Sequence, residues 1–198
     1  SSTGPPWRLG WPLSAPADDA ILAPARAIAA PPAPDAAAIE ELAAWVAAAS
    51  NPLIITGAGG REVEGFAAIS SFAERWAVPV VTVNPRFLSL PTSHPMHFGN
   101  EPGALLTEAD LIIVLEADVP WFPALQAPAA GCKVEELAID PAHQRYPMRS
   151  FACDLAIAAT PAVALTALDA AVGSKANASR VAERRERLAP LAAKRCDA

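Results

Sequence analysis

Short apolar runs alternate with amphipathic segments over most of the chain. Five of these runs predict strands: PLIITG, VPVVTV, DLIIVLEA, VEELAID and DLAIAA, at 52–57, 78–83, 110–117, 134–140 and 154–159. Most of them lack the polar alternation of a half-exposed strand. This pattern is typical of strands buried on both faces, as in a parallel sheet.

Apolar residues between the runs recur at helical spacing. Asp35 is a predicted N-cap, and the helix after it has a predicted buried face of Ile39, Leu42, Val46 and Ala49. This helix must stop near Asn51, because Pro52 disfavours helical geometry in the residue before it. A second helix, at 61–77, has a predicted buried face of Phe66, Ile69, Ala73 and Trp76.

Two further helices are predicted later in the chain. ALLTEA forms a short one at 104–109, after an irregular, proline-rich segment at 84–103. The other begins at Thr160–Pro161, a cap followed by Pro at the first helical position, and ends at Gly173. Strands and helices therefore alternate, which predicts an α/β fold. We expect a Rossmann-like three-layer sandwich around a mainly parallel sheet of five or six strands.

Composition divides the chain into three parts. Residues 1–34 are rich in Pro and have no sustained periodicity, so they predict an extended arm or linker. Residues 35–173 hold the α/β pattern. Residues 174–198 are basic, although the whole chain has a net charge of −6, and their Arg–Glu spacing indicates a solvated helix.

Charge and cysteine usage exclude several classes of protein. The net charge of −6 argues against binding to nucleic acid or an anionic membrane. The three Cys residues have no metal-ligand spacing and indicate reduced intracellular thiols. We find no signal peptide and no apolar run of membrane-spanning length, which predicts a soluble, cytoplasmic protein. The charged fraction of 18% is below the usual value of about a quarter, so we expect part of the surface to be covered.

Candidate binding residues follow the predicted strands, where ligands of parallel sheets are found. Gly57, Gly59 and Gly60 could let backbone N–H groups approach a pyrophosphate, but a tight turn alone explains them equally well. Asp118 and Asp140 could accept a ribose hydroxyl. Asp before Pro, as at Asp140, is also a common turn.

Catalytic patterns are weak in this sequence. His94 and His97 in HPMH have a loose metal-like spacing, but no third ligand lies nearby, so we expect no metal site. No nucleophile elbow, Ser–His–Asp set or acid–base pair is legible. The pattern favours a domain that positions a cofactor or serves as a scaffold, without catalytic residues of its own.

The order of segments resembles the central domain of thiamine-diphosphate-dependent enzymes, most closely the acetolactate-synthase-like branch. The resemblance covers 35–173. It rests on NPLIITGAGG, VPVVTVN, HPMHFG, EADLIIVLEADVPWFP, VEELAIDPAHQR and DLAIAATPAVAL, in this order. It implies a DHS-like NAD/FAD-binding fold and an enzyme acting on 2-oxo acids, as a carboligase or decarboxylase.

The resemblance also implies cofactors and partners. Thiamine diphosphate and Mg²⁺ would be bound by N- and C-terminal domains of a parent enzyme, with 1–34 and 174–198 as the connections to them. The family's GDG segment does not occur here, so the chain alone is expected to be inactive. The parent would be a homodimer or homotetramer.

In flavin-containing members of the family the central domain holds FAD. By position, the implied contacts are Gly57, Gly59 and Gly60, followed by Asn84, Asp118 and Asp140. However, Glu116 and Asp118 stand where such members have a glycine and a phosphate-facing arginine. Two carboxylates beside a pyrophosphate would repel it, which argues against FAD.

Two other classes of protein share part of this pattern. A free-standing module that binds FAD, NADP or ADP, as in electron-transfer flavoproteins or transhydrogenases, would share the strand and glycine turn. ITGAG is also similar to the opening of sirtuin deacylases, but the run that follows it there and the four-cysteine zinc module are missing here.

Overall fold

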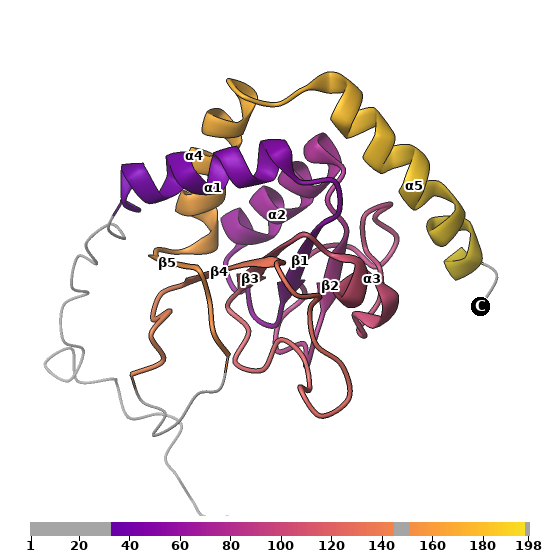
Figure 1. Ribbon diagram of the computed structural model, residues 1–198. Coiled ribbons are helices and arrows are strands. Elements are labelled where there is room, and N and C mark those ends of the chain that lie inside the picture. The colour runs from indigo at the N-terminus through magenta and orange to yellow at the C-terminus, as the bar shows by residue number, and fades with distance from the viewer. Residues whose placement is uncertain (1–32, 145–150, 197–198) are drawn as a thin grey trace, which may run out of the picture. The chain divides into compact units, whose positions relative to one another are not determined.

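The computed structural model describes residues 33–144 and 151–196, and its centre is a five-stranded parallel sheet (Figure 1). The strand order is β2-β1-β3-β4-β5. The strands are β1 (Pro52–Thr56), β2 (Val80–Thr82), β3 (Leu111–Leu115), β4 (Lys133–Ala138) and β5 (Leu155–Ala158). All five predicted strands and the α/β class are confirmed. Most of the predicted arm at 1–34 lies outside the described residues.

The two central strands are buried along their whole length. β1 and β3 pair in parallel from Pro52 opposite Leu111 to Thr56 opposite Leu115, and every residue in both is buried. Beyond the β2 edge, His97 forms a parallel bridge to Val80. The irregular segment at 84–103 therefore meets this edge of the sheet at an isolated bridge and does not form a sixth strand there.

Three helices cover one face of the sheet: α1 (Ala36–Ala48), α2 (Val63–Trp76) and α4 (Pro161–Gly173) (Figure 1). Asp35 caps α1 as predicted, since its Oδ1 accepts a hydrogen bond from the Ala38 N–H at 2.8 Å. The predicted face of α2 was partly wrong. Phe72 is buried in the core, whereas Phe66 is only half-buried, because the buried side of α2 is centred on Ile69 and Ala73.

The opposite face is covered more thinly. The short helix α3 (Gly103–Glu108) packs there with the segment that follows β3. Trp121 in that segment meets Phe151 edge-to-face, with ring centroids 5.2 Å apart. Loops therefore replace most of a helical layer on this side of the sheet.

The basic segment forms helix α5 (Ala178–Cys196). Its residue Arg184 is only 2% exposed. Burial lowers the pKa of Arg184 to about 10, so the guanidinium is still charged at neutral pH. The interpretation of this segment as a solvated helix was therefore wrong at Arg184, which lies against the ends of α1 and α2.

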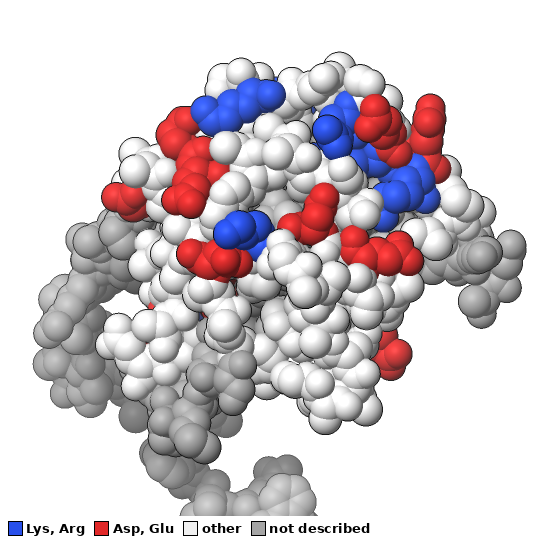
Figure 2. All heavy atoms as spheres, viewed as in Figure 1, with Lys and Arg blue, Asp and Glu red and all other residues white. Residues whose placement is uncertain are grey.

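The surface is uneven in charge. On the face shown in Figure 2, Lys, Arg, Asp and Glu lie mostly over the helices, and the lower part is largely uncharged. Among the described residues, no helix combines the length and the apolar character that crossing a membrane requires.

Candidate functional site

The strand order reverses between β1 and β3, and the carboxyl ends of these strands border a crevice. A pocket of about 190 Å³ opens there. Three of the predicted site residues, Gly57, Asn84 and Asp118, line it together with Arg86 and Glu116. The structure thus brings together residues that follow three different strands, at the place where ligands of such sheets bind.

The glycine turn after β1 is tightly packed. The Gly59 N–H donates to Thr56 Oγ1 at 3.1 Å, so this amide already has a partner within the chain. A Cβ at Gly59 would lie 2.7 Å from Thr56 Oγ1, and one at Gly60 would lie 2.6 Å from Ser89 Cα. Close packing against the following helix and the loop after β2 therefore requires these two glycines, whatever ligand they meet.

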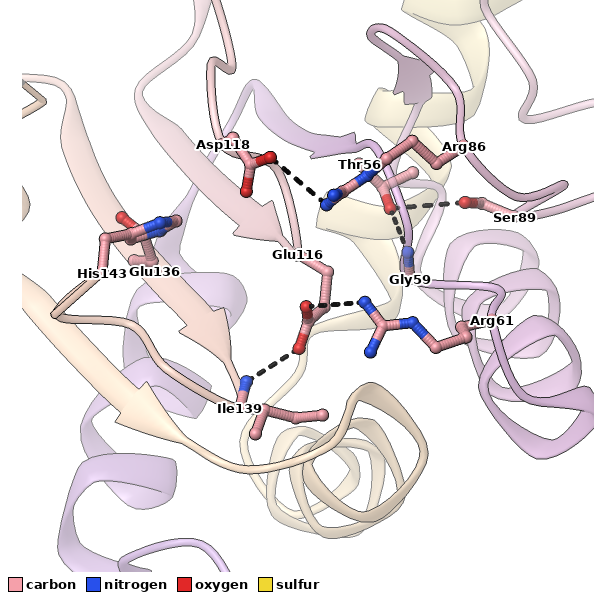
Figure 3. A network of polar contacts seen from close by, with 10 residues as sticks. All are labelled: Thr56, Gly59, Arg61, Arg86, Ser89, Glu116, Asp118, Glu136, Ile139 and His143. Atoms are coloured by element: carbon pink, nitrogen blue, oxygen red, sulfur yellow. Dashed lines mark hydrogen bonds and ion pairs between the residues drawn. The ribbon is translucent and has the colours of Figure 1, made fainter. Parts of the chain in front are cut away.

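Glu116, the residue after β3, has a left-handed conformation, with φ of 47°. Its Oε1 accepts a hydrogen bond from the Ile139 N–H at 2.7 Å, and its Oε2 lies 3.7 Å from Arg61 Nη2 (Figure 3). The carboxylate thus links the end of β4 to the residue that follows the glycine turn. It is largely enclosed, since its side chain is 12% exposed.

Asp118 has an arginine partner of its own. Arg86 Nη2, which comes from the loop after β2, lies 3.3 Å from Asp118 Oδ2 (Figure 3). The sequence analysis placed the Glu116 and Asp118 carboxylates beside a possible pyrophosphate site. It did not predict that each carboxylate is paired with an arginine that crosses from the β1–β2 side of the crevice.

Asp140 lies apart from this group. Its Oδ2 accepts a hydrogen bond from the Gln144 N–H at 3.0 Å, and its carbonyl oxygen accepts one from the His143 N–H at 3.1 Å. Asp140 therefore stabilises its own turn after β4, and it is not among the residues that line the crevice pocket. This is the turn that Asp before Pro predicts.

Two buried carboxylates in β4 were missed by the sequence analysis. Glu136 Oε1 lies 2.6 Å from His143 Nε2, and both residues are buried (Figure 3). Glu135 is 0% exposed, and neither of its carboxyl oxygens has a hydrogen-bond partner. The signal was present in VEELAID, because two consecutive carboxylates in a fully buried strand must point to opposite faces.

His94, His97 and Cys132 are the side chains to consider for metal binding or thiol chemistry. His94 Nδ1 accepts a hydrogen bond from the Met96 N–H, and His97 Nε2 lies 3.4 Å from Thr82 Oγ1, so the two rings make separate contacts. Within 33–144 and 151–196, no three His, Cys, Asp or Glu residues are grouped to hold a metal. Burial raises the pKa of Cys132 to about 11, with the charges of Asp110 and Asp154 adding to the effect, and a thiol is a weak nucleophile under such conditions.

Comparison with known proteins identifies the architecture. The family described as thiamine pyrophosphate enzyme, central domain, matches residues 39–168. A sulfoacetaldehyde acetyltransferase from Rhodobacter capsulatus is 34% identical over 101 residues, which are 48% of this chain and 17% of that protein. The family match does not favour a free-standing nucleotide-binding module.

Solved structures give the same fold. Benzoylformate decarboxylase from Polynucleobacter necessarius aligns with a TM-score of 0.58 and 25% identity, over 73% of this chain and 28% of that one. A protein assigned as a thiamin diphosphate-dependent enzyme, from Mycobacterium smegmatis, aligns with a TM-score of 0.60 and 23% identity, over 79% and 32%. The chain spans a third or less of the length of each relative. Because the family match covers more than half of the chain, this protein belongs to the thiamine pyrophosphate enzyme family and comprises its central domain.

Proposed function

We propose that this domain is the structural and cofactor-positioning centre of a thiamine-diphosphate-dependent enzyme that acts on 2-oxo acids. The parent would be a carboligase or decarboxylase of the acetolactate-synthase-like branch. Thiamine diphosphate supplies, when bound, the chemistry that cleaves the bond next to the carbonyl of a 2-oxo acid. The domain alone would be inactive.

The observation that carries this proposal is the position of the exposed apolar side chains. Phe87 and Leu88 follow β2, Phe122 and Leu125 follow β3, and Ile139 follows β4; all are more than 40% exposed. They therefore gather at the carboxyl edge of the sheet, around the crevice. Exposed apolar side chains that follow three neighbouring strands favour contact with another protein surface, and we assign that surface to the flanking domains of the parent.

The residues of this domain do not fit thiamine diphosphate or its Mg²⁺. The sequence has no GDG segment, and the described residues offer no group of three metal-ligating side chains. Mg²⁺ that accompanies a diphosphate is held through carboxylates together with the phosphate oxygens. We therefore assign both groups to other domains of the parent, and we derive no catalytic step from this chain. We still propose six residues as contacts on the side of the domain that faces the cofactor: Gly57, Gly59, Gly60, Asn84, Asp118 and Asp140.

A second candidate follows from the sulfoacetaldehyde acetyltransferase, which is 34% identical over 101 residues. The parent would then be an acetyltransferase for which sulfoacetaldehyde is a substrate. The two candidates share the central domain and the thiamine cofactor, and they differ in what reacts with the bound two-carbon unit.

The test uses the full protein encoded by the extended reading frame of this chain. It would be supplied with thiamine diphosphate, Mg²⁺ and pyruvate, alone or with sulfoacetaldehyde. Acetolactate formed from pyruvate alone supports the first candidate, and a product that requires sulfoacetaldehyde supports the second. A reading frame without a domain that carries GDG would contradict both.

A further inference from the structure

Two helices begin at the same small cavity at the carboxyl edge. α2 begins after Glu62 and α4 begins after Thr160, and neither of these N-cap residues makes a side-chain capping bond. Both line the cavity, together with Arg61 and Glu116. The first N–H groups of a helix have no partner within it, and they carry the positive end of its dipole. Two helix N-termini and a guanidinium therefore converge on one place, although α4 lacks its first N–H because it begins with Pro161.

A buried hydroxyl lines the same cavity. Thr160 is 6% exposed, and its Oγ1 has no hydrogen-bond partner among the residues that the structure describes. Burying a hydroxyl without a partner is costly, so such a group indicates a place where an acceptor belongs. This observation is independent of the two helix ends, and it points to the same kind of ligand, one that is rich in oxygen acceptors.

Glu116 already supplies an anion at this place. Its carboxylate accepts the Ile139 N–H at 2.7 Å and lies 3.7 Å from Arg61. Glu62 also lines the cavity, but its side chain is exposed. The cavity that remains is about 10 Å³, which is room for a single water molecule. Glu116 and Arg61 thus line the space in front of the two helix ends, and little free volume is left there.

The backbone at Glu116 supports this interpretation. Its φ of 47° is a conformation that residues other than Gly rarely adopt, and holding it there costs about 1 kcal/mol or more. The hydrogen bond to the Ile139 N–H and the ion pair with Arg61 hold the residue in that conformation. Such strain at a ligand-facing strand end is typical of a position with a function.

We propose that Glu116 is a built-in anion that fills a phosphate cradle formed by the N-termini of α2 and α4, Arg61 and Thr160. The cradle would bind phosphate groups if Glu116 were absent, and with Glu116 in place it excludes them. A pyrophosphate such as that of FAD would be excluded from this cavity in the same way. This inference does not depend on the proposed function.

The test is calorimetric titration of the full chain with inorganic phosphate. Glu116→Gly removes the carboxylate and relieves the positive φ, so this variant should fold. We expect it to bind phosphate at least about tenfold more tightly than the wild type does. Glu101→Gly is the control, because it removes an exposed carboxylate that lines neither the cradle nor the crevice pocket. It should bind phosphate as weakly as the wild type does.

Further variants keep the proposal testable if Glu116→Gly does not fold. Glu116→Gln keeps the size and the acceptor for the Ile139 N–H but loses the charge, so it should show a smaller gain in affinity. Adding Thr160→Val to Glu116→Gly should weaken phosphate binding by at least about threefold, since a donor is lost. Equal affinity in the wild type and in both Glu116 variants would overturn the proposal, as would an equal gain in Glu101→Gly.

Discussion

The guanidinium of Arg184 donates two hydrogen bonds to the carbonyl oxygen of Ala49, from Nε at 3.2 Å and from Nη2 at 2.7 Å. Ala49 is the C-cap of α1, and Nη1 of the same arginine donates to the carbonyl oxygen of Trp76, the last residue of α2, at 3.0 Å. A cation at two helix C-termini satisfies their free carbonyl groups and complements both dipoles. One side chain of α5 therefore ties this helix to the ends of two others.

We expect Arg184→Ala to lower the free energy of unfolding by about 2–4 kcal/mol, because four buried hydrogen bonds are lost and carbonyl groups are left without partners. Arg184→Lys keeps the charge but not the planar fork, and should lose less. Arg185 is the control: it donates to the Glu74 carbonyl oxygen but is exposed. Urea unfolding would measure the stability of Arg184→Ala, Arg184→Lys and Arg185→Ala. An Arg185→Ala variant as unstable as Arg184→Ala would contradict the special role of Arg184.

Glu135 makes stability depend on pH. Burial raises its pKa well above the usual carboxyl value, with the charge of Glu136 as a second cause, so the folded state keeps a proton that the unfolded state releases above about pH 4.3. The contribution of Glu135 to stability is therefore full at low pH. It is lost as the pH rises from the unfolded pKa toward the folded one, by up to about 1.4 kcal/mol per pH unit.

Glu135→Gln removes this proton linkage at nearly constant shape. We expect the variant to match the wild type near pH 4 and to be more stable at pH 7, as measured by chemical unfolding over that range. Glu64→Gln, on the exposed surface of α2, is the matched control. Its free energy of unfolding should depend on pH in the same way as that of the wild type. If the free energy of unfolding of Glu135→Gln showed the same pH dependence as that of the wild type, Glu135 would be ionised in the folded protein.

Gly60 should not tolerate a side chain. Its Cβ would meet the backbone of Leu88 and Ser89, and backbone cannot shift as the end of a flexible side chain can. We expect Gly60→Ala to destabilise the fold by about 1–3 kcal/mol in thermal or urea unfolding. Gly173→Ala is the control, since its Cβ would meet only Arg75 Nη2 at 3.6 Å. Equal stability of the two variants would show that the loop after β2 does not pack on the glycine turn as described.

The architecture was predictable because apolar runs report burial directly. β1 and β3, each a run of buried residues, were predicted with nearly the observed bounds, and Gly173 was correctly predicted to end α4. Local signals also located the Asp35 cap and the Asp140 turn, since each depends on neighbours a few residues away.

The contacts of the site were not predictable, because their partners are distant in the sequence. Arg61–Glu116 and Arg86–Asp118 form only after β1, β2 and β3 lie side by side. The burial of Arg184 was missed for a similar reason. Its segment is dominated by charges, and the sequence does not show that helix carbonyl groups will meet a guanidinium there.

The measurement that tests the central claim most directly is 2-oxo acid turnover by the purified chain. The chain would be incubated with thiamine diphosphate, Mg²⁺ and pyruvate or benzoylformate, and CO₂ release would be followed beside a no-protein blank and the full-length benzoylformate decarboxylase from Polynucleobacter necessarius. We predict release equal to the blank for the chain and turnover of benzoylformate for the full-length enzyme. Saturable turnover by the chain alone would contradict its assignment as a cofactor-positioning domain without catalytic residues.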